Sequence, residues 1–208
     1  MKRHGKWIIL GMVLFIIGGI ACRVTFLNAT TYGFQEETYA QNQWVPLDGN
    51  FFYNSAEHTE GYSVRVSSAE TLSYEEFMGR FEKPLDYLGE ESRHDVILLK
   101  VDFKNENNTQ GGVYIRDFNL KNESLSQYFN TNATYMGIAN PEFDPYTEGI
   151  RVQPGTESSL YFVYDTLVRA DKITYLEQLR GKDSVTMFLN VSLYPVNQMI
   201  RLDIPLEL

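Results

Sequence analysis

The chain of 208 residues has the length of one domain with a short additional segment. Hydrophobic residues make up 43% of it and aromatic residues 14%, which is enough to build a core and excludes a largely disordered chain. The net charge of −9, with no cluster of Lys and Arg, argues against a nucleic-acid partner because an acidic surface repels phosphates. The single cysteine, Cys22, excludes an internal disulfide and any site built from several cysteines.

The N-terminal residues have the pattern of an export signal. A basic tip at 1–6 precedes sixteen uncharged, mostly apolar residues, Trp7 to Cys22, and the apolar character continues to Leu27. Counted as residues 7–27, this segment is long enough to cross a bilayer as a helix. Three basic residues precede the uncharged run and one, Arg23, follows it, so the positive-inside rule places the N-terminus in the cytoplasm. We therefore expect a signal anchor in the cell membrane, with the rest of the chain outside the cytoplasm.

Two alternatives involve cleavage of this segment. Gly19-Ile20-Ala21 is a small-x-small pattern, and Cys22 stands where a lipoprotein carries its acylated cysteine. Gly19 replaces the Leu that usually stands three residues before that cysteine, and the sequence after Cys22 is unusual for a secreted protein. The sequence leaves open an anchored chain, a chain with lipidation at Cys22, and a secreted chain.

The rest of the chain divides into a polar tether at 28–43 and an extracytoplasmic domain at 44–208, in which the dominant hydrophobic period is two. Alternation at 62–67 and 99–104 predicts strands with one buried face. The turn residues at 105–112 predict a hairpin that joins 99–104 to a strand at 113–118. A second turn at 153–156 is expected to join strands at 150–152 and 160–164.

The C-terminal part predicts a last hairpin and two short helices. Apolar residues recur at every second position over 185–193 and again over 200–204. Ser73 and Thr174 each stand three residues before a glutamate, which is the spacing of a helix capping box. The predicted fold is therefore all-β, an antiparallel immunoglobulin-like or Greek-key β-sandwich with two short crossover helices, preceded by one N-terminal transmembrane helix.

Several of these features together resemble a known group of proteins. They are the basic start, the single span ending in Arg23-Val24, the polar tether, the Pro-Gly-Thr turn before 160–165, and Ser-Leu-Tyr-Pro-Val at 192–196. The chain resembles uncharacterised, membrane-anchored, extracytoplasmic immunoglobulin-like proteins of Gram-positive bacteria. The resemblance implies the fold and the location, and it implies no catalytic residues.

The sequence contains no motif that identifies an enzyme or a cofactor site. It has no Gly-x-Ser-x-Gly elbow, no His-Glu-x-x-His and no Walker loop, and His58 and His94 lie in polar, turn-like contexts. Oxygen ligands for calcium are available at 48–50 and 142–144, but no EF-hand loop is present, so scattered surface acids are the simpler interpretation. We expect no cofactor, no metal and no catalytic residue.

The best candidate for a binding surface is the segment 119–148, in which the periodicity lapses while aromatic residues persist. Its aromatic residues are Tyr128, Phe129, Tyr135, Phe143 and Tyr146. Exposed rings beside amides suit contact with a protein or a glycan. The alternative is that the rings fold back and cover one end of the sandwich, and an exposed strand edge is a second route to a partner.

These observations favour a non-enzymatic interaction or assembly module, held outside the membrane by one helix, whose partners are the membrane and an envelope or membrane protein. The alternative is an accessory protein that binds a ligand or an ion, associated with a transporter or an envelope sensor. A carboxylate-based hydrolase is a third reading, and no motif in the sequence locates its two acids.

Overall fold

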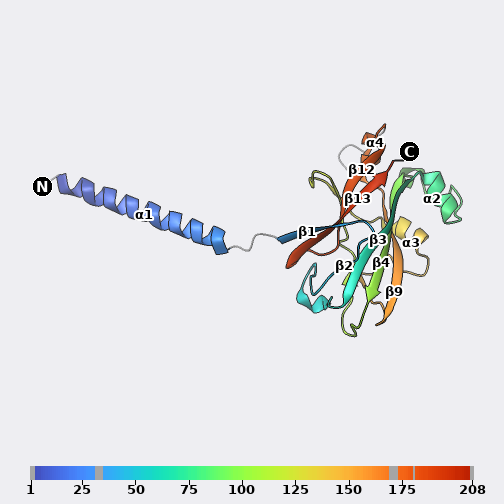
Figure 1. The fold of residues 1–208 in the computed structure, drawn as a ribbon. Coiled ribbons are helices and arrows are strands. Elements are labelled where there is room, and N and C mark those ends of the chain that lie inside the picture. Colours follow the sequence, from blue (N-terminus) through green and yellow to red (C-terminus); the bar gives the residue numbers. More distant parts are fainter. Residues whose placement is uncertain (1–2, 31–34, 169–172, 180, 207–208) are drawn as a thin grey trace. The chain divides into compact units, whose positions relative to one another are not determined.

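The computed structural model describes residues 3–30, 35–168, 173–179 and 181–206. The chain divides into two compact units, residues 1–35 and 36–208. In the first unit, α1 (Arg3–Thr30) is one continuous helix (Figure 1). The expected span at 7–27 falls on this helix, but the side chains of 7–11, 14 and 27 lie outside the described residues, as do residues 1–2 of the basic tip. Among the described residues, no helix has the length and hydropathy of a membrane span.

The second unit begins earlier than expected. The chain at Gln35–Ala40 forms strand β1, within the segment expected to be a polar tether, and α1 already occupies 28–30. Strand β1 is the edge of a sheet beside β13 (Val196–Pro205). Side-chain contacts add to this strand pairing: the Nδ2 of Asn197 donates to Glu36 at 3.0 Å, and the Nε2 of Gln198 donates to the Tyr39 hydroxyl at 3.4 Å. Such contacts between distant residues have no signature in a local pattern, so the domain does not start near Trp44.

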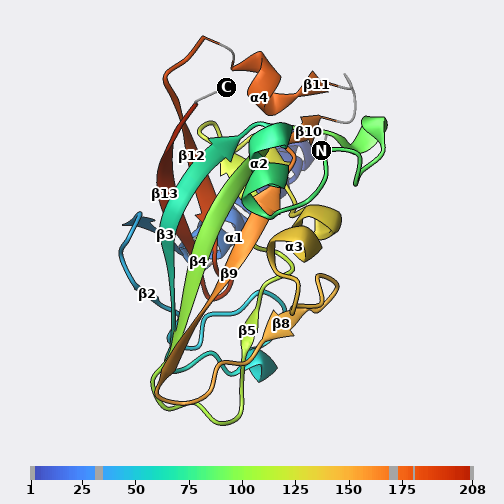
Figure 2. The ribbon, with the colours of Figure 1, turned by 90° about the vertical axis from the view of Figure 1, so that its right-hand side faces the viewer.

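Two sheets form the body of this unit (Figure 2). The larger has the order β1-β13-β12-β6-β7, where β12 is Ser184–Asn190, β6 is Leu120–Asn122 and β7 is Tyr128–Phe129. The other has the order β2-β3-β4-β9, with β2 at Val45–Pro46, β3 at Tyr62–Leu72, β4 at Val96–Asn105 and β9 at Thr156–Tyr164. Strands β13 and β3 are in contact across the two sheets, so the architecture is a β-sandwich, as predicted.

The remaining elements are short. Two ribbons pair β5 (Val113–Tyr114) with β8 (Gly149–Ile150) and β10 (Leu167–Val168) with β11 (Ile173–Thr174). The helices of the domain are η1 (Ser55–Glu57), α2 (Tyr74–Arg80), η2 (Glu90–Ser92), α3 (Ala133–Ala139) and α4 (Tyr175–Gln178). Helix α2 contacts β3, and α3 contacts β9 (Figure 2).

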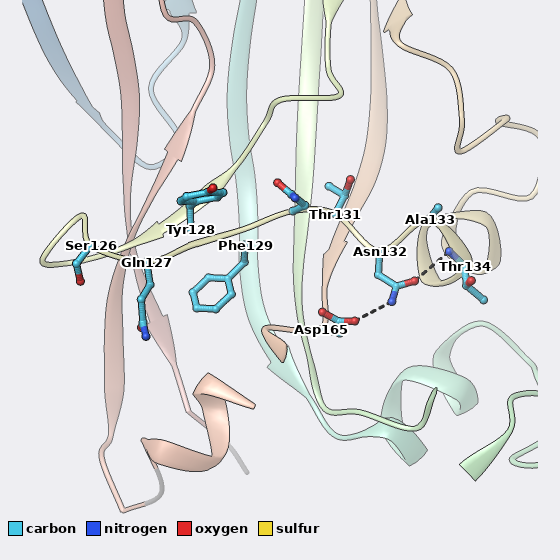
Figure 3. A pocket seen from close by; sticks show the side chains of 10 residues that line it. Ser126, Gln127, Tyr128, Phe129, Thr131, Asn132, Ala133, Thr134 and Asp165 are labelled. Atoms are coloured by element: carbon cyan, nitrogen blue, oxygen red, sulfur yellow. Dashed lines mark hydrogen bonds between the residues drawn. The ribbon is translucent and has the colours of Figure 1, made fainter. Parts of the chain in front are cut away.

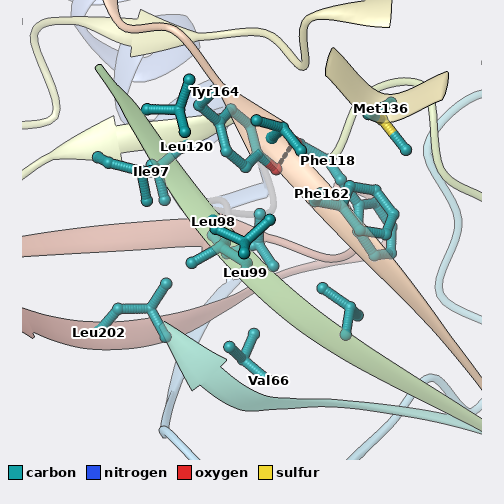
Figure 4. Packing of buried hydrophobic residues seen from close by; sticks show 14 of the residues in the cluster. Val66, Ile97, Leu98, Leu99, Phe118, Leu120, Met136, Phe162, Tyr164 and Leu202 are labelled. Carbon is teal, nitrogen blue, oxygen red and sulfur yellow. Dashed lines mark hydrogen bonds between the residues drawn. The ribbon is translucent and has the colours of Figure 1, made fainter. Parts of the chain in front are cut away.

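The core lies between the two sheets and confirms the period-two patterns. In the β12–β13 hairpin, Met187 pairs with Leu202 and Leu189 with Ile200, and all four side chains are buried. Figure 4 shows the aromatic part of the core, where the rings of Phe118 and Phe162 stack at 5.5 Å between centroids. Burial on this scale, not the short helices, supplies the driving force for folding.

The predicted helices at 73 and 174 are also confirmed. Ser73 and Thr174 each accept a hydrogen bond from the backbone amide three residues on, and Glu76 and Glu177 return the contact, which completes both capping boxes. Gly181 has φ +85°, the conformation expected after a helix, whereas Arg180 lies outside the described residues.

Two predicted hairpins are wrong. Residues 113–118 do not pair with β4, because both edges of β4 are occupied by β3 and β9. Likewise, 149–150 pairs with β5 and not with the strand at 156–164. The chain leaves the sheet at the end of β4, at Asn105, and then passes close to another loop: an added Cβ at Gly111 would collide with the carbonyl of His58. The turn at 153–156 is present, but it leads β9 along β4.

Candidate functional site

A pocket lies in the segment that the sequence singled out (Figure 3). Its volume is 720 Å³, which is within the roughly 300–1,000 Å³ of pockets for small ligands. Nine of its lining residues are consecutive, running from Ser126 through β7 to Thr134 at the start of α3, and the tenth is Asp165, just after β9.

Strand β7 separates two neighbouring aromatic residues. Figure 3 shows the side chains of Tyr128 and Phe129 on opposite sides of the strand, as alternation requires. Phe129 is 7% exposed, and its ring lies 5.3 Å from that of Tyr175. Tyr128 is 67% exposed. Of this pair, only the tyrosine offers its ring to a partner.

The wall between β7 and α3 is held by Asn132. Its Nδ2 donates to the Oδ2 of Asp165 at 2.8 Å, and its Oδ1 accepts from the amides of Thr134 and Tyr135. Its own amide donates to the carbonyl of Val163 at 2.8 Å. Asn132 therefore fixes the wall to β9 and begins helix α3, and its side chain is fully engaged in that role.

A second pocket, of 360 Å³, shares Asn130, Thr131 and Ala133 with the first. Its other lining residues include Phe143 and Tyr146. Phe143 is half-buried against the core, whereas Tyr146 is 79% exposed. The segment 130–133 therefore borders both pockets, and each pocket carries one exposed tyrosine.

Tyr135 lies inside the domain. It is 1% exposed; its hydroxyl donates to the carbonyl of Ser92 at 2.8 Å and accepts from the amide of His94 at 3.0 Å. Burial raises the pKa of Tyr135 to about 12. The Tyr135 ring is therefore structural. Tyr135, Phe129 and Phe143 pack against the sandwich, as expected if the rings of this segment fold back onto it.

The sequence did not identify most of the polar lining. Gln127, Asn130, Thr131 and Asp165 belong to the pockets because β7, α3 and the end of β9 meet there. The one local signal is Asn132, a residue type that favours the position before a helix. Helix α3 itself was not predicted, since its seven residues ATYMGIA are too few to establish a period.

The other features considered from the sequence lie apart from the pockets. His58 is exposed and His94 half-buried, and neither lines a described pocket. Cys22 is an exposed free thiol on α1. Among the described residues, no group of three or more His, Cys, Asp or Glu side chains could hold a metal ion.

Strand β7 is also the open edge of the larger sheet. The amide of Asn122 donates to the carbonyl of Gln127, and Lys121 faces Tyr128 in the register. Hydrogen-bonded and non-hydrogen-bonded pairs alternate in antiparallel sheets, so the backbone groups of Tyr128 point away from β6. The edge is short, with two residues in the strand.

These observations define a β-sandwich domain with a polar, tyrosine-bearing pair of pockets. The chain belongs to the family described as a domain of unknown function (DUF5028), whose model matches residues 36–198. The match begins within β1 and ends within β13, so the family unit includes the strand that lies before Trp44. No curated protein and no solved structure matches the chain.

Proposed function

We propose that this chain is a non-enzymatic interaction module, anchored in a membrane by residues 7–27, that binds an envelope component through the surface around Tyr128 and Tyr146. One observation carries the binding site: two pockets share the wall 130–133, and each presents an exposed tyrosine. Tyrosine offers a large apolar face and a hydroxyl at little entropic cost, which suits recognition.

The membrane location is supported by the charge pattern. Four basic and no acidic residues occupy 1–27, and three of the basic residues precede the apolar run. The immunoglobulin-like topology and an origin in Gram-positive bacteria stay predictions of the resemblance. Intact mass and fractionation of the full-length chain test the anchor. A full-length mass in the membrane fraction supports it, and loss of residues 1–21, with or without a lipid on Cys22, replaces it with a lipoprotein or a secreted chain.

The binding role is tested with detergent-insoluble envelope material, from which membranes have been removed. The double variant Tyr128→Ala/Tyr146→Ala should sediment with this material at least about tenfold less than the unaltered chain. The matched control is Tyr53→Ala/Tyr87→Ala, which removes two exposed tyrosines outside both pockets. Equal sedimentation of the two double variants would overturn the assignment.

The volume of the larger pocket favours a second candidate, an accessory protein that binds a small ligand or an ion. In that case a soluble ligand or calcium should raise the melting temperature of the full-length chain, because binding to the folded state stabilises it. Tyr128→Ala should then abolish the shift. A melting temperature that no ligand of a broad panel alters would remove this candidate.

A further inference from the structure

The chemistry of the larger pocket identifies the kind of molecule that it would hold. Among the described residues that line it, none is Lys, Arg or His, and one carries a carboxylate, Asp165. Asn132 already donates to that carboxylate at 2.8 Å. The described lining of this pocket therefore provides no cation for an anionic ligand, and Asn132 already engages its one acid. The second pocket carries one cation, Arg116, which pairs with Glu148 at 3.2 Å, and one further acid, Asp117.

The rest of the lining is neutral and polar. Hydroxyls come from Ser126, Thr131 and Thr134, and amides from Gln127 and Asn130. Amides and hydroxyls both donate and accept hydrogen bonds, so they match a ligand with many neutral hydroxyl groups. They match an apolar peptide poorly, because burying them without partners is costly.

The exposed aromatic rings supply the apolar part of such a site. A pyranose ring has one face of C–H groups, and the electron-rich face of an aromatic ring attracts these weakly positive hydrogens. Tyr128, at 67% exposure, lines the first pocket, and Tyr146, at 79%, lines the second. Because Asn130, Thr131 and Ala133 belong to both pockets, one ligand could follow the shared wall from one tyrosine to the other.

We infer that the paired pockets bind a neutral polysaccharide chain, with sugar rings on Tyr128 and Tyr146 and sugar hydroxyls bonded to Asn130 and Thr131. This inference rests on the proposed binding role of the surface and names its ligand class. The two pockets favour an oligomer over a monosaccharide, because a single sugar ring is too small to fill both pockets, whose volumes are 720 and 360 Å³.

The test uses the full-length chain in a zwitterionic detergent without sugar groups, so that the micelle offers no competing ligand. Calorimetric titration with neutral hexasaccharides of glucose and of N-acetylglucosamine is compared with titration of an anionic hexagalacturonate. We expect at least one neutral hexamer to bind, its monosaccharide to bind at least about tenfold more weakly, and hexagalacturonate not to bind. Absence of binding by both neutral hexamers, or preference for the anionic one, would overturn the inference.

Three variants within the pockets and one control outside them distinguish a glycan site from other contacts. Tyr128→Ala should weaken binding by about tenfold, and Tyr128→Phe, which keeps the ring, should restore most of it. Asn130→Leu should also weaken binding by about tenfold, because it removes an exposed amide and leaves an apolar side chain. Tyr87→Ala, a 54% exposed tyrosine outside both pockets, should have no effect. Tighter binding in Asn130→Leu would overturn the inference, since it would indicate an apolar ligand.

Failure of this inference can be distinguished from failure of the proposed function. If Tyr128→Ala/Tyr146→Ala loses sedimentation with envelope material but no hexasaccharide binds, the interaction role stands and the glycan inference fails. Protease treatment of the envelope material adds a second separation. If the target is a glycan, the chain still sediments with envelope material that has been treated with protease. If the target is a protein, this sedimentation is lost.

Discussion

The side-chain amide of Asn140 hydrogen-bonds to both backbone groups of Tyr161: its Oδ1 accepts from the amide and its Nδ2 donates to the carbonyl, each at 2.8 Å. Asn140 therefore does for β9 what a neighbouring strand would do. The backbone amide of Asn132 donates to the Val163 carbonyl in the same strand. Together, Asn132 and Asn140 cover part of the β9 edge of the smaller sheet and attach α3 to that edge.

Loss of this contact should destabilise the domain. Asn140→Ala removes the side-chain partner of the half-buried backbone amide and carbonyl of Tyr161, so we expect the free energy of unfolding to fall by about 2 kcal/mol. Urea unfolding of the full-length chain measures it, with Asn130→Ala as an exposed asparagine control on the adjacent segment. Equal unfolding curves for the two variants would contradict the role of Asn140.

Tyr128 and Phe129 provide a matched pair of neighbours. Phe129→Ala should lower the free energy of unfolding by about 3–5 kcal/mol, because it opens a cavity in the core beside Tyr175. Tyr128→Ala should change it by less than about 0.5 kcal/mol, because that ring is exposed. A large loss in Tyr128→Ala would show that this ring is structural and would remove it from the binding surface.

Asp102 should make stability depend on acid pH. Burial favours the protonated form, but hydrogen bonds from Ser159 and Arg65, both at 2.7 Å, outweigh it and hold the pKa of Asp102 below its ordinary value. A lowered folded-state pKa contributes stability above the unfolded value, near 4, that is lost as the pH falls through the folded-state pKa. The stability difference between the unaltered chain and Asp102→Asn should therefore shrink below about pH 4; a constant difference would contradict this.

Tyr135 should make stability depend on alkaline pH. Its pKa of about 12 lies above the ordinary value of 10.0, so its contribution is present below pH 10 and is lost as the pH rises toward 12. Between pH 10 and 12, the contribution of Tyr135 to the free energy of unfolding falls by about 2–3 kcal/mol. Denaturant unfolding at pH 9 to 12 should show a smaller decline in Tyr135→Phe than in the unaltered chain, and identical declines would exclude Tyr135 as the cause.

Local signals were sufficient for some elements of this fold. The capping boxes at Ser73 and Thr174 and the β12–β13 hairpin depend on residues close in sequence, so their patterns predict them. Strand β1 depends on side chains near residue 197, and the ribbon of β5 with β8 joins residues about thirty-five positions apart. No alternation or turn signal encodes such pairings.

In the candidate site, too, some features follow from local sequence and others depend on distant residues. The lapse of periodicity at 119–148 selected a segment that supplies most of the lining of both pockets, although this segment contains the short elements β6, β7 and α3. Which rings are exposed could not be predicted, because that depends on distant partners: Tyr135 is fixed by residues 92 and 94, and Phe129 by Tyr175. The polar lining was missed because Asp165 reaches the pocket only through the fold.

Photo-cross-linking in intact cells tests the binding surface most directly. The full-length chain carries a benzophenone amino acid at position 128 or, as control, at the exposed position 87. We predict a cross-linked adduct of increased mass from position 128 and little or none from position 87. Equal adduct yields from the two positions, or no adduct at 128, would contradict the claim that Tyr128 contacts an envelope component.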